Sequence, residues 1–224
     1  MLSEEINLSQ FEAIIFDMDG VLIDSEPLWK IVMEDVFAEV GCNLTRKDFE
    51  RTVGLRIDEV VAYWFTQRPW LNYSIEEVID KIMEGMVSII SDQGKPMLGV
   101  LDALAFFQNK GLKIGVATSS YTRLLNATLD KLDIRRYLQA YCSAETEPFG
   151  KPHPAVFITA ANQMGVEPLK CLVIEDSLNG IIAAKASRMT VICIPEPTHT
   201  PNTKLSLADF EYVNLEVLIG ALSK

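Results

Sequence analysis

The sequence is poor in the residues that build several common kinds of site. It holds two histidines and four cysteines in 224 residues, and no two cysteines have the C-x-x-C spacing. Neither a zinc site nor a disulfide framework is therefore expected. The G-x-S-x-G elbow of serine hydrolases and the G-x-G-x-x-G loop of dinucleotide-binding proteins are also missing. These absences argue against nucleophilic serine chemistry and against dinucleotide binding.

Long hydrophobic runs and an excess of positive charge are lacking as well. No run approaches the ~18 apolar residues that a membrane helix needs, and the acidic N-terminus has none of the features of a signal peptide. Twenty basic residues against 31 acidic ones give a net charge of −11. Such a surface repels nucleic acid and anionic membranes, so we expect neither as a partner. The composition and the few, widely spaced cysteines predict a cytoplasmic protein, which we expect to be a monomer.

Hydrophobic periodicity predicts an alternation of strands and helices, which is typical of an α/β fold with a doubly wound, parallel, Rossmann-like sheet. The expected strands lie at 13–16, 112–117, 138–142, 171–174, 190–194 and, more weakly, near 212–213. Three amphipathic helices without a convincing strand interrupt the alternation between Asp24 and Met97. We therefore expect an α/β core domain of residues 1–23 and 92–224, with an inserted helical cap domain of residues 24–91.

The most informative segment is E-A-I-I-F-D-M-D-G-V-L-I-D-S at residues 12–25. An apolar strand ends there in Asp17 and Asp19, just before a turn at Gly20. Ligands of open α/β sheets bind at the carboxyl ends of the strands. Two close carboxylates repel each other unless a cation or a shared proton compensates, and Mg²⁺ prefers such oxygen ligands. A pair of acids in a solvated turn is the more ordinary interpretation, so the rest of the chain has to decide.

Three further segments place polar residues where predicted strands end. Thr118 and Ser119 precede a helix, where hydroxyls and backbone N–H groups can bind an anion or simply cap the helix. Lys151 stands in G-K-P-H-P, a loop that its prolines fix, although most lysines are exposed and solvated. Glu175 and Asp176 lie between a strand and a helix, where capping is the alternative to metal binding.

Taken in order, these four motifs resemble those of the haloacid dehalogenase (HAD) superfamily over about residues 12–195. The resemblance implies a Mg²⁺-dependent phosphatase in which Asp17 is the nucleophile and Asp19 the general acid and base. It implies phosphate binding by Thr118, Ser119 and Lys151, and metal binding by Asp17, Asp19 (through its backbone carbonyl), Glu175 and Asp176. In one departure, the chain has Arg188 where the family pattern leads us to expect a glycine before the next strand.

Substrate choice is expected to come from the cap. Arg56, Glu26 and Trp29 are candidates for contacts with the substrate, although a solvated arginine and a tryptophan packed within the cap are the more ordinary interpretations. The runs D-S-E-P-L-W, G-L-R-I and Q-R-P-W resemble the group of hexitol phosphatases and 2-deoxyglucose-6-phosphate phosphatases. This resemblance implies carbohydrate metabolism, with hexose and hexitol monophosphates such as 2-deoxyglucose 6-phosphate as substrates.

Other functions share parts of this pattern. A β-phosphoglucomutase-type phosphosugar mutase has the same core motifs and returns the phosphoryl group to a sugar instead of to water. A signalling receiver domain also combines acids, a hydroxyl group, a lysine and Mg²⁺ on a doubly wound sheet, but the order of the motifs and the long helical insertion disfavour it. A catalytically inactive binding protein is disfavoured because the residues for catalysis are all present.

Overall fold

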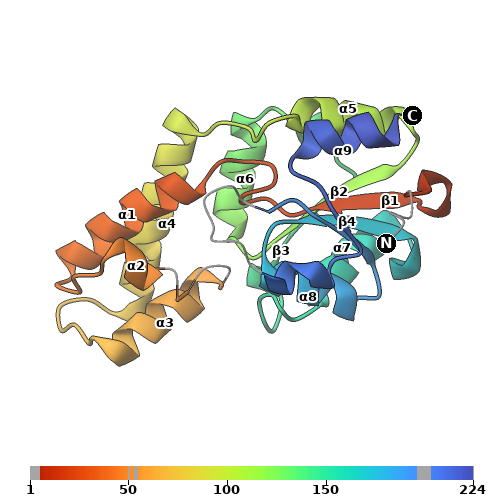
Figure 1. Ribbon diagram of the computed structural model, residues 1–224. Coiled ribbons are helices and arrows are strands. Elements are labelled where there is room, and N and C mark those ends of the chain that lie inside the picture. Colours follow the sequence, from red (N-terminus) through yellow and green to blue (C-terminus); the bar gives the residue numbers. More distant parts are fainter. Residues whose placement is uncertain (1–5, 50, 53–54, 196–202, 224) are drawn as a thin grey trace.

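The computed structural model describes residues 6–49, 51–52, 55–195 and 203–223. Within them, six strands form one sheet in the order β3-β2-β1-β4-β5-β6, and every neighbouring pair is parallel (Figure 1). The strands are β1 (Ala13–Phe16), β2 (Lys113–Thr118), β3 (Ala140–Ser143), β4 (Cys171–Glu175), β5 (Thr190–Cys193) and β6 (Phe210–Glu211). The predicted α/β fold with a parallel, doubly wound sheet is confirmed. The last strand ends just before the predicted position near 212–213.

Strand β1 lies at the centre of the sheet. It pairs with β2 on one side and with β4 on the other, and all four of its residues are buried. An uninterrupted apolar run is what a parallel strand covered on both faces requires. Because the chain order reverses between β1 and β4, this is the point of the sheet where open α/β folds bind ligands.

Helices cover both faces of the sheet (Figure 1). One face packs against α5 (Val100–Asn109), α6 (Thr122–Lys131) and α9 (Leu215–Leu222), and the other against α7 (Ala155–Met164) and α8 (Leu178–Ala186). The alternation of side chains along β1 explains the two cores, since Ile14 and Phe16 join the first and Ala13 and Ile15 the second. The sequence did not predict α5, whose face toward the sheet is buried.

Four helices follow β1 and lie together at one end of the molecule (Figure 1). They are α1 (Glu26–Glu39), α2 (Arg46–Phe49), α3 (Ile57–Gln67) and α4 (Ile75–Gln93), of which only the short α2 was not predicted. The chain enters and leaves this helical segment side by side, because Ile23 pairs with Pro96 in an isolated antiparallel bridge. The N–H of Asp24 donates to the carbonyl of Lys95 (3.0 Å), and that of Met97 to the carbonyl of Leu22 (3.0 Å).

The turn between α8 and β5 contains Arg188, at the position where the sequence analysis expected a glycine. Arg188 has a φ of 65°, in the left-handed region that glycine adopts without a steric penalty. The backbone therefore has the conformation expected for glycine, and the side chain of Arg188 adds steric strain to it.

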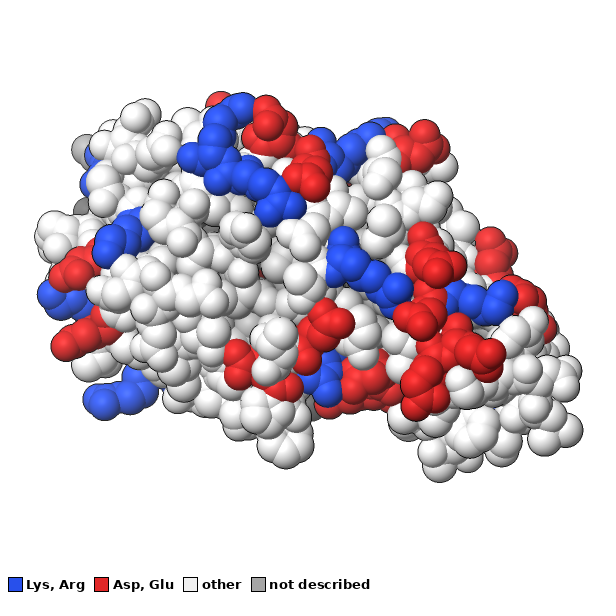
Figure 2. Space-filling model, turned by 180° about the vertical axis from the view of Figure 1, so that it is seen from behind, with Lys and Arg blue, Asp and Glu red and all other residues white. Residues whose placement is uncertain are grey.

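The surface carries charges of both signs. On the face drawn in Figure 2, Lys and Arg side chains are interspersed with Asp and Glu side chains over the described residues. A search of the described helices for one with the length and apolarity of a membrane span found none.

Candidate active site

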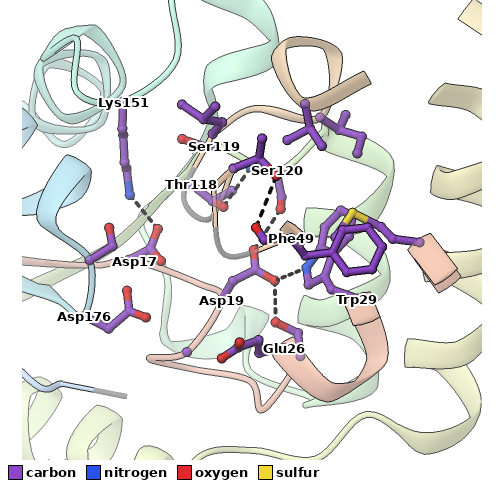
Figure 3. Close-up of a pocket in the computed structure, with 18 of the residues that line it drawn as sticks. Asp17, Asp19, Glu26, Trp29, Phe49, Thr118, Ser119, Ser120, Lys151 and Asp176 are labelled. Atoms are coloured by element: carbon purple, nitrogen blue, oxygen red, sulfur yellow. Dashed lines mark hydrogen bonds and ion pairs between the residues drawn. The ribbon is translucent and has the colours of Figure 1, made fainter. Parts of the chain in front are cut away.

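A pocket lies between the helical segment and the carboxyl ends of β1, β2 and β4 (Figure 3). The sequence-predicted residues that line it are Asp17, Asp19, Glu26, Thr118, Ser119, Lys151, Glu175 and Asp176. Trp29 also lines it, whereas Arg56 does not. Residues separated by more than half of the chain therefore meet in one cavity, because those of the sheet end or follow strands whose carboxyl ends lie side by side.

Lys151 is the centre of a buried ion-pair network. Its Nζ donates to Asp17 Oδ1 (2.5 Å), to Glu175 Oε1 (2.6 Å) and to the carbonyl of Ala117 (2.9 Å). The residue is only 3% exposed, and these three acceptors account for all three ammonium protons. The network fixes a positive charge beside Asp17 without the help of water.

Burial changes the pKa values of both Asp17 and Lys151. It raises the pKa of Asp17 to about 7, an effect that Lys151 opposes and the neighbouring Glu175 and Asp19 reinforce. Burial lowers the pKa of Lys151, but attraction to Asp17 and Glu175 outweighs it, so the pKa of this lysine lies above its ordinary value. Lys151 therefore stays charged at neutral pH, and its ammonium group is the main contribution that favours the ionised form of Asp17.

Glu175 is held at the start of α8. Its Oε2 accepts the N–H groups of Asp176 and Ser177 and the Ser177 hydroxyl, each at 3.1 Å. A carboxylate is favoured at a helix N-terminus by the backbone dipoles. Only glycine fits at position 180, because a Cβ there would lie 1.8 Å from Glu175 Oε1. Glu175 thus has both oxygens engaged, one of them by Lys151.

Three carboxylates could hold a cation here. Asp17, Glu175 and Asp176 each place an oxygen within 4.8 Å of the others. One buried lysine does not balance three such groups, and hard oxygen donors suit Mg²⁺, so the residues present fit this ion. Gly20, at a φ of 77°, leaves room for Asp176, since a Cβ at position 20 would lie 2.4 Å from Asp176 Oδ2.

Asp19 is held from two sides, and its side chain is not part of that group of three (Figure 3). Its Oδ1 accepts the Ser25 hydroxyl (2.5 Å) and the indole N–H of Trp29 (3.1 Å), both from the start of the helical segment. Its Oδ2 accepts the Ser120 hydroxyl (2.8 Å) from the loop after β2. These three partners escaped the sequence analysis, which treated Trp29 as a packing residue or a sugar contact. The T-S-S run after β2 was a signal for Ser120.

The loop after β2 also prepares an anion site. Thr118 is buried, and its Oγ1 accepts the N–H of Ser120 at 3.0 Å, which shapes the turn before α6. The Ser119 hydroxyl is buried and has no hydrogen-bond partner in the described part of the chain. A buried hydroxyl without a partner is costly unless a ligand satisfies it. Both side chains line the pocket.

Arg56 links the helical segment to the core instead. Its Nε and Nη2 donate to the two oxygens of Asp58 (2.7 and 2.8 Å), and its Nη1 to the carbonyls of Ala144 (2.9 Å) and Glu147 (3.2 Å). The guanidinium is therefore occupied by the protein in this structure. The residues just before it, Val53 and Gly54 of the predicted loop, lie outside the described residues.

Comparisons with known proteins agree with this geometry. The family model described as haloacid dehalogenase-like hydrolase matches residues 14–194. Hexitol phosphatase B of Escherichia coli (strain K12) is 40% identical over 210 residues, which are 93% of this chain and 95% of that protein. A phosphorylated carbohydrates phosphatase of Thermotoga maritima is 31% identical over 176 residues, with 79% and 81% covered.

A solved structure is similar as well. CbbY from Rhodobacter sphaeroides, determined in complex with phosphate, superposes with a TM-score of 0.85 over 96% of this chain and 100% of that one. At 22% sequence identity, this likeness concerns the fold.

Proposed function

We propose that this chain, which belongs to the haloacid dehalogenase-like hydrolases, hydrolyses the monophosphate esters of sugars and sugar alcohols with Asp17 as its nucleophile. Two of its relatives are named hexitol phosphatase B and phosphorylated carbohydrates phosphatase. The observation that carries the proposal is the contact between Asp17 and the buried Lys151, in a pocket that also holds Asp19 and a group of carboxylates.

In the first chemical step, a carboxylate oxygen of Asp17 attacks phosphorus and forms an aspartyl phosphate. The bond from phosphorus to the sugar oxygen breaks, and Asp19 donates a proton to that oxygen. In the second step, water attacks phosphorus, Asp19 takes the proton of the water, and the bond to Asp17 breaks. The products are inorganic phosphate and the free sugar or polyol, and both aspartates return to their starting forms.

Fixed positive charge and hydrogen-bond donors supply the electrostatics. The Lys151 ammonium offsets the charge of Asp17, so that an anionic ester can approach it. Thr118 and Ser119 lie beside the backbone N–H groups before α6, where they bind the phosphoryl oxygens. Ser25, Trp29 and Ser120 orient Asp19 toward the leaving oxygen.

A magnesium ion fits this chemistry. Asp17, Asp176 and the backbone carbonyl of Asp19 would hold it, while Glu175 acts mainly through Lys151, because both of its oxygens are engaged. When bound, the ion supplies positive charge that lowers the repulsion between the carboxylates and the phosphoryl group.

We assign substrate choice to the helical segment of residues 24–91, as a cap domain over a core of residues 1–23 and 92–224. Glu26 and Trp29 contribute to the wall of the pocket from this cap. The similarity to hexitol phosphatase B favours hexitol and hexose monophosphates, including 2-deoxyglucose 6-phosphate. We also propose a monomer in the cytoplasm, with no nucleic acid or membrane as a partner, on the strength of the acidic composition and the four free cysteines.

The experiment is phosphate release from a panel of hexose and hexitol monophosphates, with Mg²⁺ and then with EDTA in excess. We expect turnover with Mg²⁺, its loss with EDTA and its recovery when Mg²⁺ is restored. Asp17→Asn should abolish turnover of every ester, and activity retained in a clean preparation of this variant would refute the nucleophile assignment. A phosphosugar mutase would instead interconvert sugar phosphates and depend on a bisphosphate activator. A receiver domain would hold its phosphate without turning over a pool of esters.

A further inference from the structure

The half of the pocket that lies in the helical segment offers little positive charge. Among the described residues that line the pocket, the cationic ones are Lys151 and Lys30. Lys151 lies at the phosphoryl end, where Asp17 and Glu175 already surround it. The remaining wall on the side of the cap includes apolar side chains, such as Met33 and Phe49.

Lys30 is already neutralised. Its Nζ lies 2.6 Å from Glu26 Oε1, one helical turn earlier on α1. Both side chains are largely shielded from solvent, with 31% of Lys30 and 17% of Glu26 exposed. Partial burial strengthens such a pair relative to one at the surface, because water screens it less. The pair presents no net charge to a ligand in this half of the pocket.

Among the described residues, Arg56 does not replace Lys30. It does not line the pocket, and its guanidinium donates to Asp58 and to the carbonyls of Ala144 and Glu147.

We propose that the pocket admits substrates with a single phosphate group, and that Glu26 sets this limit by neutralising Lys30. The inference rests on the proposed function and specifies its substrate class: a phosphate ester whose remaining part is an uncharged polyol. A second phosphate would bring about two negative charges at neutral pH into a partly buried, acidic site. Hydroxyl groups carry no such penalty and can accept or donate hydrogen bonds to the Glu26–Lys30 pair.

The exclusion of a second phosphate group would also favour hydrolysis over phosphoryl transfer to a sugar phosphate. An enzyme that returns its phosphoryl group to a phosphorylated sugar must hold a sugar bisphosphate at that moment. A pocket without a free cation for the second phosphate binds this species weakly. Water is then the acceptor that the site favours.

The test compares a hexose 1,6-bisphosphate with the corresponding hexose 6-phosphate as substrates for the full-length protein with Mg²⁺. For the wild type, we expect kcat/KM to be much lower for the bisphosphate. In Glu26→Gln, which keeps the shape of the side chain and releases Lys30, the ratio of kcat/KM for the bisphosphate to that for the monophosphate should rise roughly tenfold. The ratio is the readout because Glu26 is itself part of the pocket wall.

Three further variants identify the source of the change in this ratio. Asp35→Asn removes one negative charge from an exposed position on the same helix and should leave the ratio unchanged. Adding Lys30→Met to Glu26→Gln should reverse the rise. Lys30→Met alone leaves Glu26 without this partner and should lower the ratio further, which tests the idea even where Glu26→Gln does not fold.

Three results would overturn the inference. They are a wild type that hydrolyses the bisphosphate as readily as the monophosphate, a ratio that Glu26→Gln does not change, and a rise that persists in the double variant. Failure of the proposed function looks different, since neither ester would then be hydrolysed by the wild type.

Discussion

Asp17→Asn should remove activity, and its stability relative to the wild type should increase as the pH rises. The Asp17 carboxyl is buried among other acids, which raises its pKa from 3.8 to about 7. For an acid with a raised pKa, the folded state resists ionisation that the unfolded chain undergoes freely. Stability is therefore lost as the pH rises from 3.8 through about 7. Asparagine has the same shape and cannot ionise, so the variant lacks this loss.

The size of the stability difference follows from the pKa shift of Asp17. A change from 3.8 to about 7 corresponds to a cost of about 4 kcal/mol once the carboxyl is fully ionised, because one pKa unit is worth ~1.4 kcal/mol. Less than half of this cost is present at about pH 5, and nearly all of it at about pH 8. The difference in unfolding free energy between Asp17→Asn and the wild type should thus grow by about 2–3 kcal/mol over this interval.

Urea unfolding at several pH values, with EDTA present throughout, measures this difference. The change with pH is a better readout than the absolute difference, because the altered hydrogen bond from Lys151 contributes similarly at each pH. Asp35→Asn is the matched control, since its carboxylate is exposed on α1 and its stability should run parallel to that of the wild type. In a second series with Mg²⁺ in place of EDTA, the ion should stabilise the wild type more than Asp17→Asn, because it gains a carboxylate ligand only in the wild type.

Parallel curves for Asp17→Asn and the wild type between about pH 5 and pH 8 would refute the reasoning. They would mean that Lys151 fully compensates the burial of Asp17, so that this carboxylate is stable at neutral pH without a metal ion.

The remaining predictions concern residues that hold the site in place. Gly180→Ala should cost about 1–3 kcal/mol of stability and most of the activity, because its Cβ would lie 1.8 Å from Glu175 Oε1. Its control is Gly220→Ala, with nothing within 4 Å of the added Cβ, which should be neutral or stabilising in thermal unfolding. Arg188→Gly should stabilise the protein by up to ~1 kcal/mol in the same assay, since it relieves a φ of 65°; an unchanged or lower stability would contradict this. Arg56→Lys keeps the charge but cannot keep both the paired bonds to Asp58 and the bonds to the carbonyls of Ala144 and Glu147 that join the helical segment to the core. We expect kcat/KM to fall about threefold to tenfold, and an unchanged value would show that this link is dispensable.

The sequence was sufficient for the fold class and for most of the pocket. Asp17, Thr118 and Glu175 each end or directly follow an apolar run, and a parallel sheet brings the carboxyl ends of neighbouring strands together. Local patterns are enough for this kind of prediction, because the strand and its terminal residues are adjacent in the chain.

Contacts between distant side chains could not be predicted in the same way. Arg56 donates to the carbonyl of Ala144, 88 residues away, and the loop sequence does not reveal that orientation. The indole N–H of Trp29 reaches Asp19 only because α1 begins at the edge of the pocket. The helix at residues 100–109 was missed because few polar residues interrupt it, and a short, mostly apolar run does not by itself distinguish a helix from a buried strand.

The isolated bridge between Ile23 and Pro96 has a consequence for engineering. Since the helical segment departs and returns at adjacent points, its two ends match a single short graft site on the core. Exchanging residues 24–95 for the equivalent segment of a relative would leave Asp17, Lys151, Glu175 and Asp176 in place. Chimaeras joined at this neck should inherit the substrate preference of the donor while keeping the chemistry of the recipient.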